Sequence, residues 1–86
     1  MNDLESPYTM NGNLLGPTLL LKRRELHLTQ AEVCSKLKVI GVQLDRTALS
    51  RIEWGRRTLT DIELIGFVQV LGLNLQEVVE NLHNQS

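Results

Sequence analysis

The chain has 86 residues, of which 42% are apolar and 22% are charged, and it contains a single cysteine. This length allows one domain, and the composition is typical of a soluble globular protein. One cysteine cannot form an intramolecular disulfide, the short apolar runs predict no membrane-spanning helix, and the acidic residues 1–6 predict no signal peptide. We therefore expect a small cytoplasmic domain.

The net charge is only −1, but the charges are unevenly distributed. All nine lysines and arginines lie between Lys22 and Arg57, a segment that holds four acidic residues and therefore carries +5. Residues 1–21 carry −2 and residues 58–86 carry −4. A basic middle between acidic ends is typical of a domain with one phosphate-attracting face, although chance clustering on solvated helices gives the same pattern.

Residues 1–15 predict a flexible tail, because they are rich in asparagine, contain Pro7 and Gly12, and show no hydrophobic period. A first helix is predicted from Pro17 to Leu26, since proline fits the first helical turn. Its end at His27 is unusual, because a glycine suits the left-handed position after a helix better. The inner face of this helix is expected to comprise Leu19, Arg23 and Leu26.

A second helix begins with the capping box of Thr29 and Glu32, in which each residue caps the other's backbone N–H. Its inner face is expected to comprise Val33, Cys34 and Leu37. The segment from Lys38 to Leu44 contains Gly41 and β-branched residues, and it is predicted to be a long connection.

Asp45 is a good N-cap for a third helix over residues 46–54, which glycine 55 ends. Leu49 and Ile52 lie three residues apart and are predicted to face inward. Thr60 and Glu63 form a second capping box that begins a fourth helix, which ends at Leu71 before a glycine. The inner stripe of the fourth helix is predicted to comprise Ile62, Ile65, Val68 or Gln69, and Leu71 or Gly72.

Asn74 and Glu77 predict the start of a fifth helix, which continues to about His83. No segment alternates long enough to predict a strand, so the fold class is all-α: a compact five-helix domain over residues 16–83, followed by a short tail at 84–86.

The outward side of the third helix carries polar side chains that suit DNA bases. Arginine hydrogen-bonds guanine, and threonine or alanine contacts the thymine methyl group. The candidate base-contacting residues are Arg46, Thr47, Ser50 and Arg51.

Phosphate contacts are expected on both sides of this helix. The N-terminal end of the second helix attracts anions through its free N–H groups and its dipole. Residues that follow the third helix lie where a groove-bound helix meets the DNA backbone. The candidate phosphate-contacting residues are Thr29, Gln30, Arg56, Arg57 and Thr58.

The segments Leu28-Thr29-Gln30-Ala31-Glu32 and Leu49-Ser50-Arg51-Ile52-Glu53-Trp54-Gly55-Arg56-Arg57 resemble the phage-repressor and Cro-like helix-turn-helix family, also called the XRE family. The resemblance covers about residues 17–82. It implies a lambda-repressor-like fold, DNA contact by Gln30, base contacts at the four outward positions of the third helix, and a structural ion pair between Arg23 and Glu53.

The chain departs from the family pattern in four places. The connection between the second and third helices is longer, His27 replaces a common glycine, Cys34 replaces a small alanine, and Trp54 replaces a common asparagine or lysine. Two interpretations of Trp54 remain open. Its ring packs on the fourth helix or the long connection, or it lies against a DNA sugar or a neighbouring subunit.

Surplus leucines and valines predict a homodimer, because one small core cannot cover all of them. The predicted interface comprises Leu75, Val79 and Leu82. A dimer suits a palindromic operator, whose half-sites lie about one helical turn apart.

The leading hypothesis is a sequence-specific transcriptional regulator, a repressor by expectation, that binds double-stranded DNA in the cytoplasm at the nucleoid. No enzyme activity, cofactor, metal or small-molecule ligand is expected, because the spacing of Cys34 and the two histidines matches no metal or catalytic site. The alternative is a protein-interaction adaptor or antitoxin-like module of the same fold. The near-zero net charge, the acidic C-terminal third and the surplus leucines support that alternative.

Overall fold

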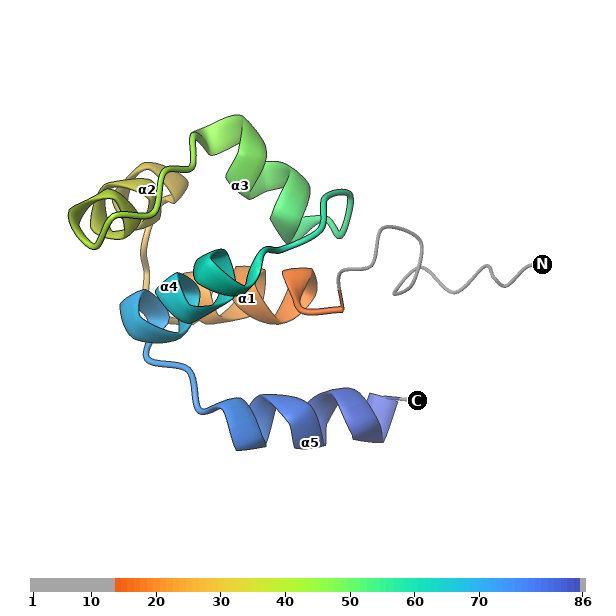
Figure 1. The fold of residues 1–86 in the computed structure, drawn as a ribbon. Coiled ribbons are helices and arrows are strands. Elements are labelled where there is room, and N and C mark those ends of the chain that lie inside the picture. Colours follow the sequence, from red (N-terminus) through yellow and green to blue (C-terminus); the bar gives the residue numbers. More distant parts are fainter. Residues whose placement is uncertain (1–13, 86) are drawn as a thin grey trace.

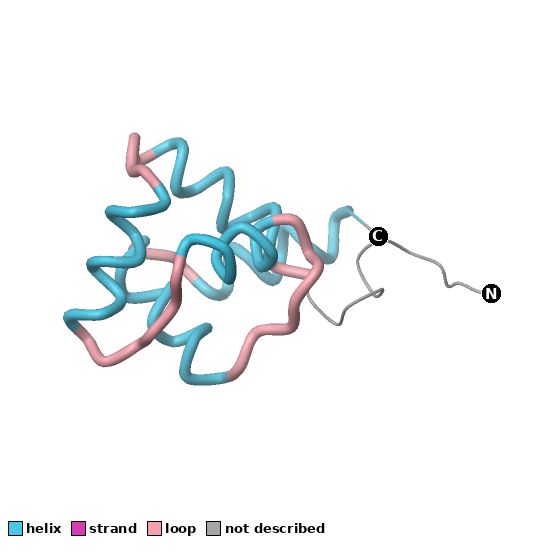
Figure 2. Tube along the Cα trace, turned by 90° about the horizontal axis from the view of Figure 1, so that it is seen from above, coloured by secondary structure: helices cyan, strands magenta, loops and turns pink. Residues whose placement is uncertain are grey.

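A computed structural model describes the backbone of residues 14–85 and the side chains of residues 14–80. Five helices and no strands are found in this part of the chain, which makes the fold all-α (Figures 1 and 2). The helices are α1 (Gly16–Glu25), α2 (Gln30–Val39), α3 (Arg46–Glu53), α4 (Asp61–Leu71) and α5 (Leu75–Gln85). Helices α1 and α2 each pack against both α3 and α4. In Figure 1, α3 and α5 lie at opposite ends of the molecule.

Helix α1 ends in a six-residue cap built around a left-handed residue. The N–H of Leu28 donates to the carbonyl of Arg23, and the N–H of His27 donates to the carbonyl of Arg24. These are the two hydrogen bonds of a Schellman motif, whose penultimate residue needs a positive φ. His27 has that conformation, with φ 59°, although it is not a glycine. Leu26, expected on the inner face, is 41% exposed because the chain turns away at this cap.

Replacing His27 by glycine is expected to stabilise the domain by up to about 1 kcal/mol, because glycine adopts positive φ without the Cβ clash that histidine suffers there. The matched control is His27→Ala, which removes the imidazole but keeps the Cβ and should bring no gain. Urea denaturation of both variants measures the difference. Equal stability of the glycine and alanine variants would contradict the assigned strain.

Helix α2 begins as predicted and ends later than predicted. Thr29 Oγ1 accepts from the N–H of Glu32, and the Glu32 carboxylate accepts from the N–H of Thr29, so the capping box is confirmed. The helix continues through residues 38 and 39, which were assigned to the connection. Its cap explains why: Gly41, with φ 89°, lets the N–H of Val42 reach the carbonyl of Leu37. The connection is therefore the shorter segment Ile40–Asp45.

The remaining caps agree with the sequence. Asp45 Oδ1 accepts from the N–H of Ala48 at 2.7 Å, and α3 ends one residue earlier than expected. The capping box of Thr60 and Glu63 is present, and α4 ends where Gly72 adopts φ 65°. Asn74 Oδ1 accepts from the N–H of the residue three positions on, at the start of α5.

The buried core gathers side chains from α1–α4 and from the connection between α2 and α3. Phe67 has no exposed surface and is the largest of the fully buried side chains. The core residues are Leu19, Val33, Leu37, Val42, Leu49, Ile52, Phe67 and Leu71. Cys34 is partly buried and packs against this cluster, as expected of a small core residue. Leu15, assigned to the N-terminal tail, also packs against it, so the ordered unit begins before residue 16.

Two glycines allow helices to approach each other closely. A Cβ on Gly16 would overlap the carbonyl oxygen of Ile52 and lie 3.0 Å from that of Glu53, so the start of α1 touches the backbone at the end of α3. A Cβ on Gly66 would lie 2.9 Å from a methyl group of Val42, so α4 also packs closely against a side chain of the connection. The position of α3 is therefore fixed by backbone contact with α1.

The predicted inner stripe of α4 is wrong at its first two positions. Ile62 is 65% exposed and Ile65 is 58% exposed. Leu71, one of the predicted alternatives, is buried, and the other buried residues are Glu63, Gly66 and Phe67. Most residues of α4 are apolar, so a 3.6-residue period fits more than one face, and the sequence pattern alone does not choose between them.

Helix α5 runs two residues beyond its predicted end and includes residues 84 and 85, which were assigned to a tail. Among the residues of α5 whose side chains the structure describes, Val78 is buried, with 6% of its surface exposed. Among the described residues, no helix has the length and apolar character needed to cross a membrane.

Candidate nucleic-acid interface

The outward side of α3 presents a polar stripe to solvent. Arg46, Thr47 and Arg51 are exposed, and Ser50 is half-buried. Leu49 and Ile52 on the opposite side have no exposed surface. The short helix therefore divides sharply into a buried apolar side and an open polar side. All four candidate base-contacting residues lie on the open side or at its edge, so one surface presents them together.

The charges on this stripe are available to a ligand. Arg46 and Arg51 form no ion pair with any other described residue, and the same holds for exposed Arg56 just beyond the helix. Between Arg46 and Thr60 the only acidic residue is Glu53. Glu53 is 2% exposed and its carboxylate is paired with Arg23, so it presents no acidic group at this surface. The stripe and the residues that follow it therefore form a cationic surface.

The start of α2 lies beside the start of α3. A hollow of about 560 Å³ is lined by Arg23, His27, Leu28, Thr29, Gln30, Ala31 and Arg46. Two candidate phosphate-contacting residues, Thr29 and Gln30, therefore share a surface with the candidate base-contacting Arg46. The Thr29 hydroxyl is used by the capping box, so its hydrogen bond is internal. The other bond of the box, from the Thr29 backbone N–H to the Glu32 carboxylate, holds the pKa of that carboxyl below its ordinary value.

Glu53 ties α3 to both α1 and α2. Its carboxylate accepts from Arg23 Nε at 2.6 Å and from Arg23 Nη2 at 3.1 Å, and it also accepts from Gln30 Nε2 at 3.1 Å. Arg23 and Glu53, expected as an ion pair, thus form one, and the hydrogen bond raises the pKa of Arg23 while burial acts against it. The bond from the Gln30 side chain was not foreseen. It leaves fewer side-chain donors for phosphate at the start of α2.

The cationic residues after α3 divide into one free and one bound side chain. Arg57 donates to both oxygens of Glu63 at 2.9 Å and to the carbonyl of Thr58 at 3.0 Å. Arg56 is exposed. Of the two arginines expected to contact phosphate here, Arg56 has its charge open to solvent, whereas the charge of Arg57 is paired with Glu63. The partner of Arg57 was missed because Glu63 was interpreted only as part of a capping box.

Glu63 makes the loop between α3 and α4 sensitive to acid. The Arg57 hydrogen bonds, aided by the N–H of Thr60, hold the pKa of Glu63 below its ordinary value of 4.5, while burial raises it. A carboxyl with a lowered folded pKa stabilises the fold above its unfolded pKa, and this stabilisation is lost as the pH falls through the folded pKa. We expect the thermal midpoint to fall as the pH is lowered below about 4.5.

The test compares wild type with Glu63→Gln, which cannot ionise. The variant should have a lower thermal midpoint at neutral pH, and the plots of thermal midpoint against pH should converge for the two proteins in acid. A weaker pH-dependence of the thermal midpoint in Arg57→Ala would also assign the effect to the Arg57–Glu63 pair. Parallel plots for wild type and Glu63→Gln would contradict this assignment.

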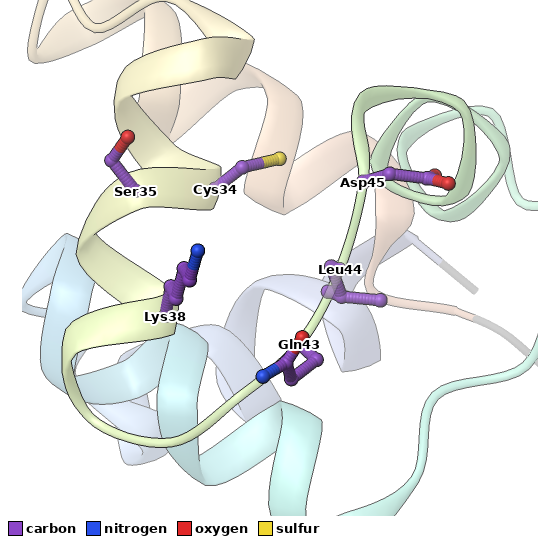
Figure 3. A pocket seen from close by; sticks show the side chains of 6 residues that line it. All are labelled: Cys34, Ser35, Lys38, Gln43, Leu44 and Asp45. Atoms are coloured by element: carbon purple, nitrogen blue, oxygen red, sulfur yellow. The ribbon is translucent and has the colours of Figure 1, made fainter.

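A second hollow lies between α2 and the connection to α3. It has a volume of about 440 Å³ and is lined by Cys34, Ser35, Lys38, Gln43, Leu44 and Asp45 (Figure 3). Burial, followed by the charge of Asp45, raises the pKa of the Cys34 thiol above its ordinary value. The thiol therefore stays neutral and unreactive at neutral pH. The connection bulges around this hollow, and α3 nevertheless packs on α2.

The residues expected at a dimer interface are partly open. Leu75 is 47% exposed and Val79 is 61% exposed, on the helix that lies across the molecule from α3 (Figure 1). Leu82 lies outside the residues whose side chains the structure describes. Trp54 is 66% exposed, so most of its surface is open to solvent, which disfavours the interpretation in which its ring packs on α4 or on the connection.

Within the described part of the chain, no cluster of three or more histidine, cysteine or acidic side chains is arranged to hold a metal ion. Comparison with known protein families, with curated proteins and with solved structures finds no match for this chain. The geometry and charge of the surface around α3 are therefore the basis on which its function is inferred.

Proposed function

We propose that this protein is a sequence-specific DNA-binding transcriptional regulator that inserts α3 into the major groove. The observation that carries the proposal is the outward stripe of α3, on which Arg46 and Arg51 are exposed without an ion partner among the described residues. Arginines on the solvent-facing side of a short helix suit base edges in the major groove. The packing of α2 on α3 is consistent with a lambda-repressor-like helix-turn-helix.

In this proposal, α2 and the loop after α3 hold the domain on the DNA backbone. The backbone N–H groups of Gln30 and Ala31 have no hydrogen-bond acceptor among the described residues, and they lie at the positive end of the α2 dipole. Arg56 supplies an exposed charge on the other side of α3. Contacts of these types fix the register of a protein on DNA and do not read sequence.

The protein acts as a homodimer in this proposal. Its α5 carries the exposed side chains of Leu75 and Val79, and α5 lies away from α3, so an interface there leaves the DNA-contacting surface open (Figure 1). A two-fold dimer binds a palindromic operator and represses by occupying a promoter in the cytoplasm. No chemical step, cofactor or small-molecule ligand is part of this function.

Selection from a random duplex library tests the proposal. The expected result is enrichment of a two-fold symmetric sequence whose half-sites lie about one helical turn apart. Failure to retain any duplex at low salt would overturn DNA binding. Sedimentation at concentrations on the order of tens of micromolar tests the dimer separately, and a monomer there would remove the dimer from the proposal.

A protein-interaction module is the second candidate. The observation that favours it is the exposure of Ile62 and Ile65 on α4, in addition to Leu75 and Val79 on α5. Apolar side chains grouped on a surface are typical of protein interfaces. Under this candidate the chain binds a protein partner and shows little affinity for duplex DNA at any salt concentration.

A further inference from the structure

We infer that Trp54 is a DNA-backbone contact at the edge of the major groove, where its ring packs on deoxyribose without reading sequence. The inference rests on the proposed function and adds to it an apolar contact at the C-terminal end of α3. Trp54 caps α3 and exposes 66% of its surface. Tryptophan is enriched at interfaces because it carries a large apolar surface, so an open ring next to the predicted reading surface is available to a ligand bound there.

The position of Trp54 on α3 places it on the same side as the base-contacting residues. It follows Thr47 by seven positions and Ser50 by four, which is the spacing of residues on one helix face. Seven residues of helix span about 10 Å, and the major groove is about 12 Å wide. If the start of α3 touches base edges, its C-terminal end reaches the groove wall, where sugars and phosphates lie.

The charges around Trp54 favour DNA over a second copy of the chain. Arg51 and Arg56 flank it, both exposed and without an ion partner among the described residues. The neighbouring Glu53 is buried and paired with Arg23, so it does not offset them. In a two-fold interface formed around this residue, each arginine would face its own copy and be repelled. A polyanion such as DNA is attracted by the positive charges of Arg51 and Arg56.

Two properties of the ring determine the expected effects. It carries no charge, so its loss should lower affinity without changing the number of counterions released on binding. It does not read bases, so the loss should be equal for operator and random duplex. We expect Trp54→Ala to weaken binding to both about tenfold. Trp54→Phe, which keeps a flat ring, should recover part of that loss.

The test uses the full chain, a random duplex and a selected duplex, with affinities measured by mobility shift at several salt concentrations. Trp54 is the only tryptophan, so its emission reports on this one position. The inference expects an emission change on adding duplex and a tenfold weaker Trp54→Ala with an unchanged salt slope. Arg56→Ala should have a salt slope that is shallower by about one for each bound protomer. Circular dichroism confirms that each variant is folded.

Three outcomes would overturn the inference. Binding with unchanged emission and unchanged affinity of Trp54→Ala rejects it and leaves the proposed function standing. An emission change that follows protein concentration without DNA assigns Trp54 to contact between copies. Absence of any duplex binding rejects the proposed function and this inference together.

Discussion

Replacing Arg23 by alanine is expected to destabilise the fold by about 3–5 kcal/mol. The change removes two of the three hydrogen bonds to the Glu53 carboxylate and leaves only the bond from Gln30. Glu53 is 2% exposed, so the substitution leaves its carboxylate without its charged partner in a largely buried site. A chain of this length has a total stability of roughly 4–13 kcal/mol, and the loss is a large part of it.

The substitution should also loosen the attachment of α3 to α1, because Glu53 belongs to α3 and Arg23 belongs to α1. Thermal or urea unfolding measures the effect, and Arg24→Ala is the matched control. Arg24 is exposed and forms no ion pair with the described residues, so its loss should change stability by less than about 0.5 kcal/mol. Equal effects of the two substitutions would show that the buried pair does not hold α3.

A double variant separates the ion pair from simple packing. Arg23→Met together with Glu53→Leu removes both charges and keeps apolar volume, so no unpaired carboxylate is left in the core. Such replacements of buried pairs are often neutral or stabilising. We expect this variant to be more stable than Arg23→Ala alone. The reverse order would mean that the side-chain volume of Arg23, and not the charge of Glu53, determines the effect.

Replacing Arg46 and Arg51 together by alanine is expected to weaken binding to a selected operator by about 30-fold to on the order of 10⁴-fold. Each side chain contributes about 1–3 kcal/mol when it contacts a base edge, and the two effects add if the contacts are independent. Both side chains are exposed, so the fold should keep its stability. Random duplex should lose less affinity than the operator, because the lost contacts carry sequence information.

The matched control for this pair is Arg24→Ala with Lys36→Ala. It removes the same charge from exposed positions on α1 and α2. A purely electrostatic role would make the two double variants equally weak on both duplexes. Unchanged operator affinity in Arg46→Ala/Arg51→Ala would reject the assignment of α3 as the reading helix.

Local rules predicted where the helices begin, because N-capping is a short-range effect. The capping boxes at Thr29 and Thr60 and the cap at Asp45 each depend on residues three positions apart, and all three are present. The stripe of α4 was wrong at its first two positions for the opposite reason. Its burial depends on tertiary packing around Phe67 and on the close approach of Gly66 to Val42, neither of which is encoded within the helix.

In the candidate site, too, local features were predicted correctly and contacts between distant residues were missed. The outward direction of Arg46 and Arg51 followed from the period of α3, because its apolar face is unambiguous. The binding of Arg57 by Glu63 and of Gln30 by Glu53 depends on side chains that meet only after folding. The end of α2 was misplaced because Gly41 was interpreted as part of the connection, whereas it is the left-handed residue of a cap in which the N–H of Val42 donates to the carbonyl of Leu37.

The salt dependence of binding to random duplex tests the central claim most directly. A protein that binds DNA through exposed cations releases counterions, so the logarithm of its affinity falls linearly with the logarithm of the salt concentration. With Arg46, Arg51 and Arg56 exposed on one surface, we predict a slope of about −1 to −3 for each protomer. Affinity that does not change with salt, or no binding at low salt, would contradict the claim that this surface binds DNA.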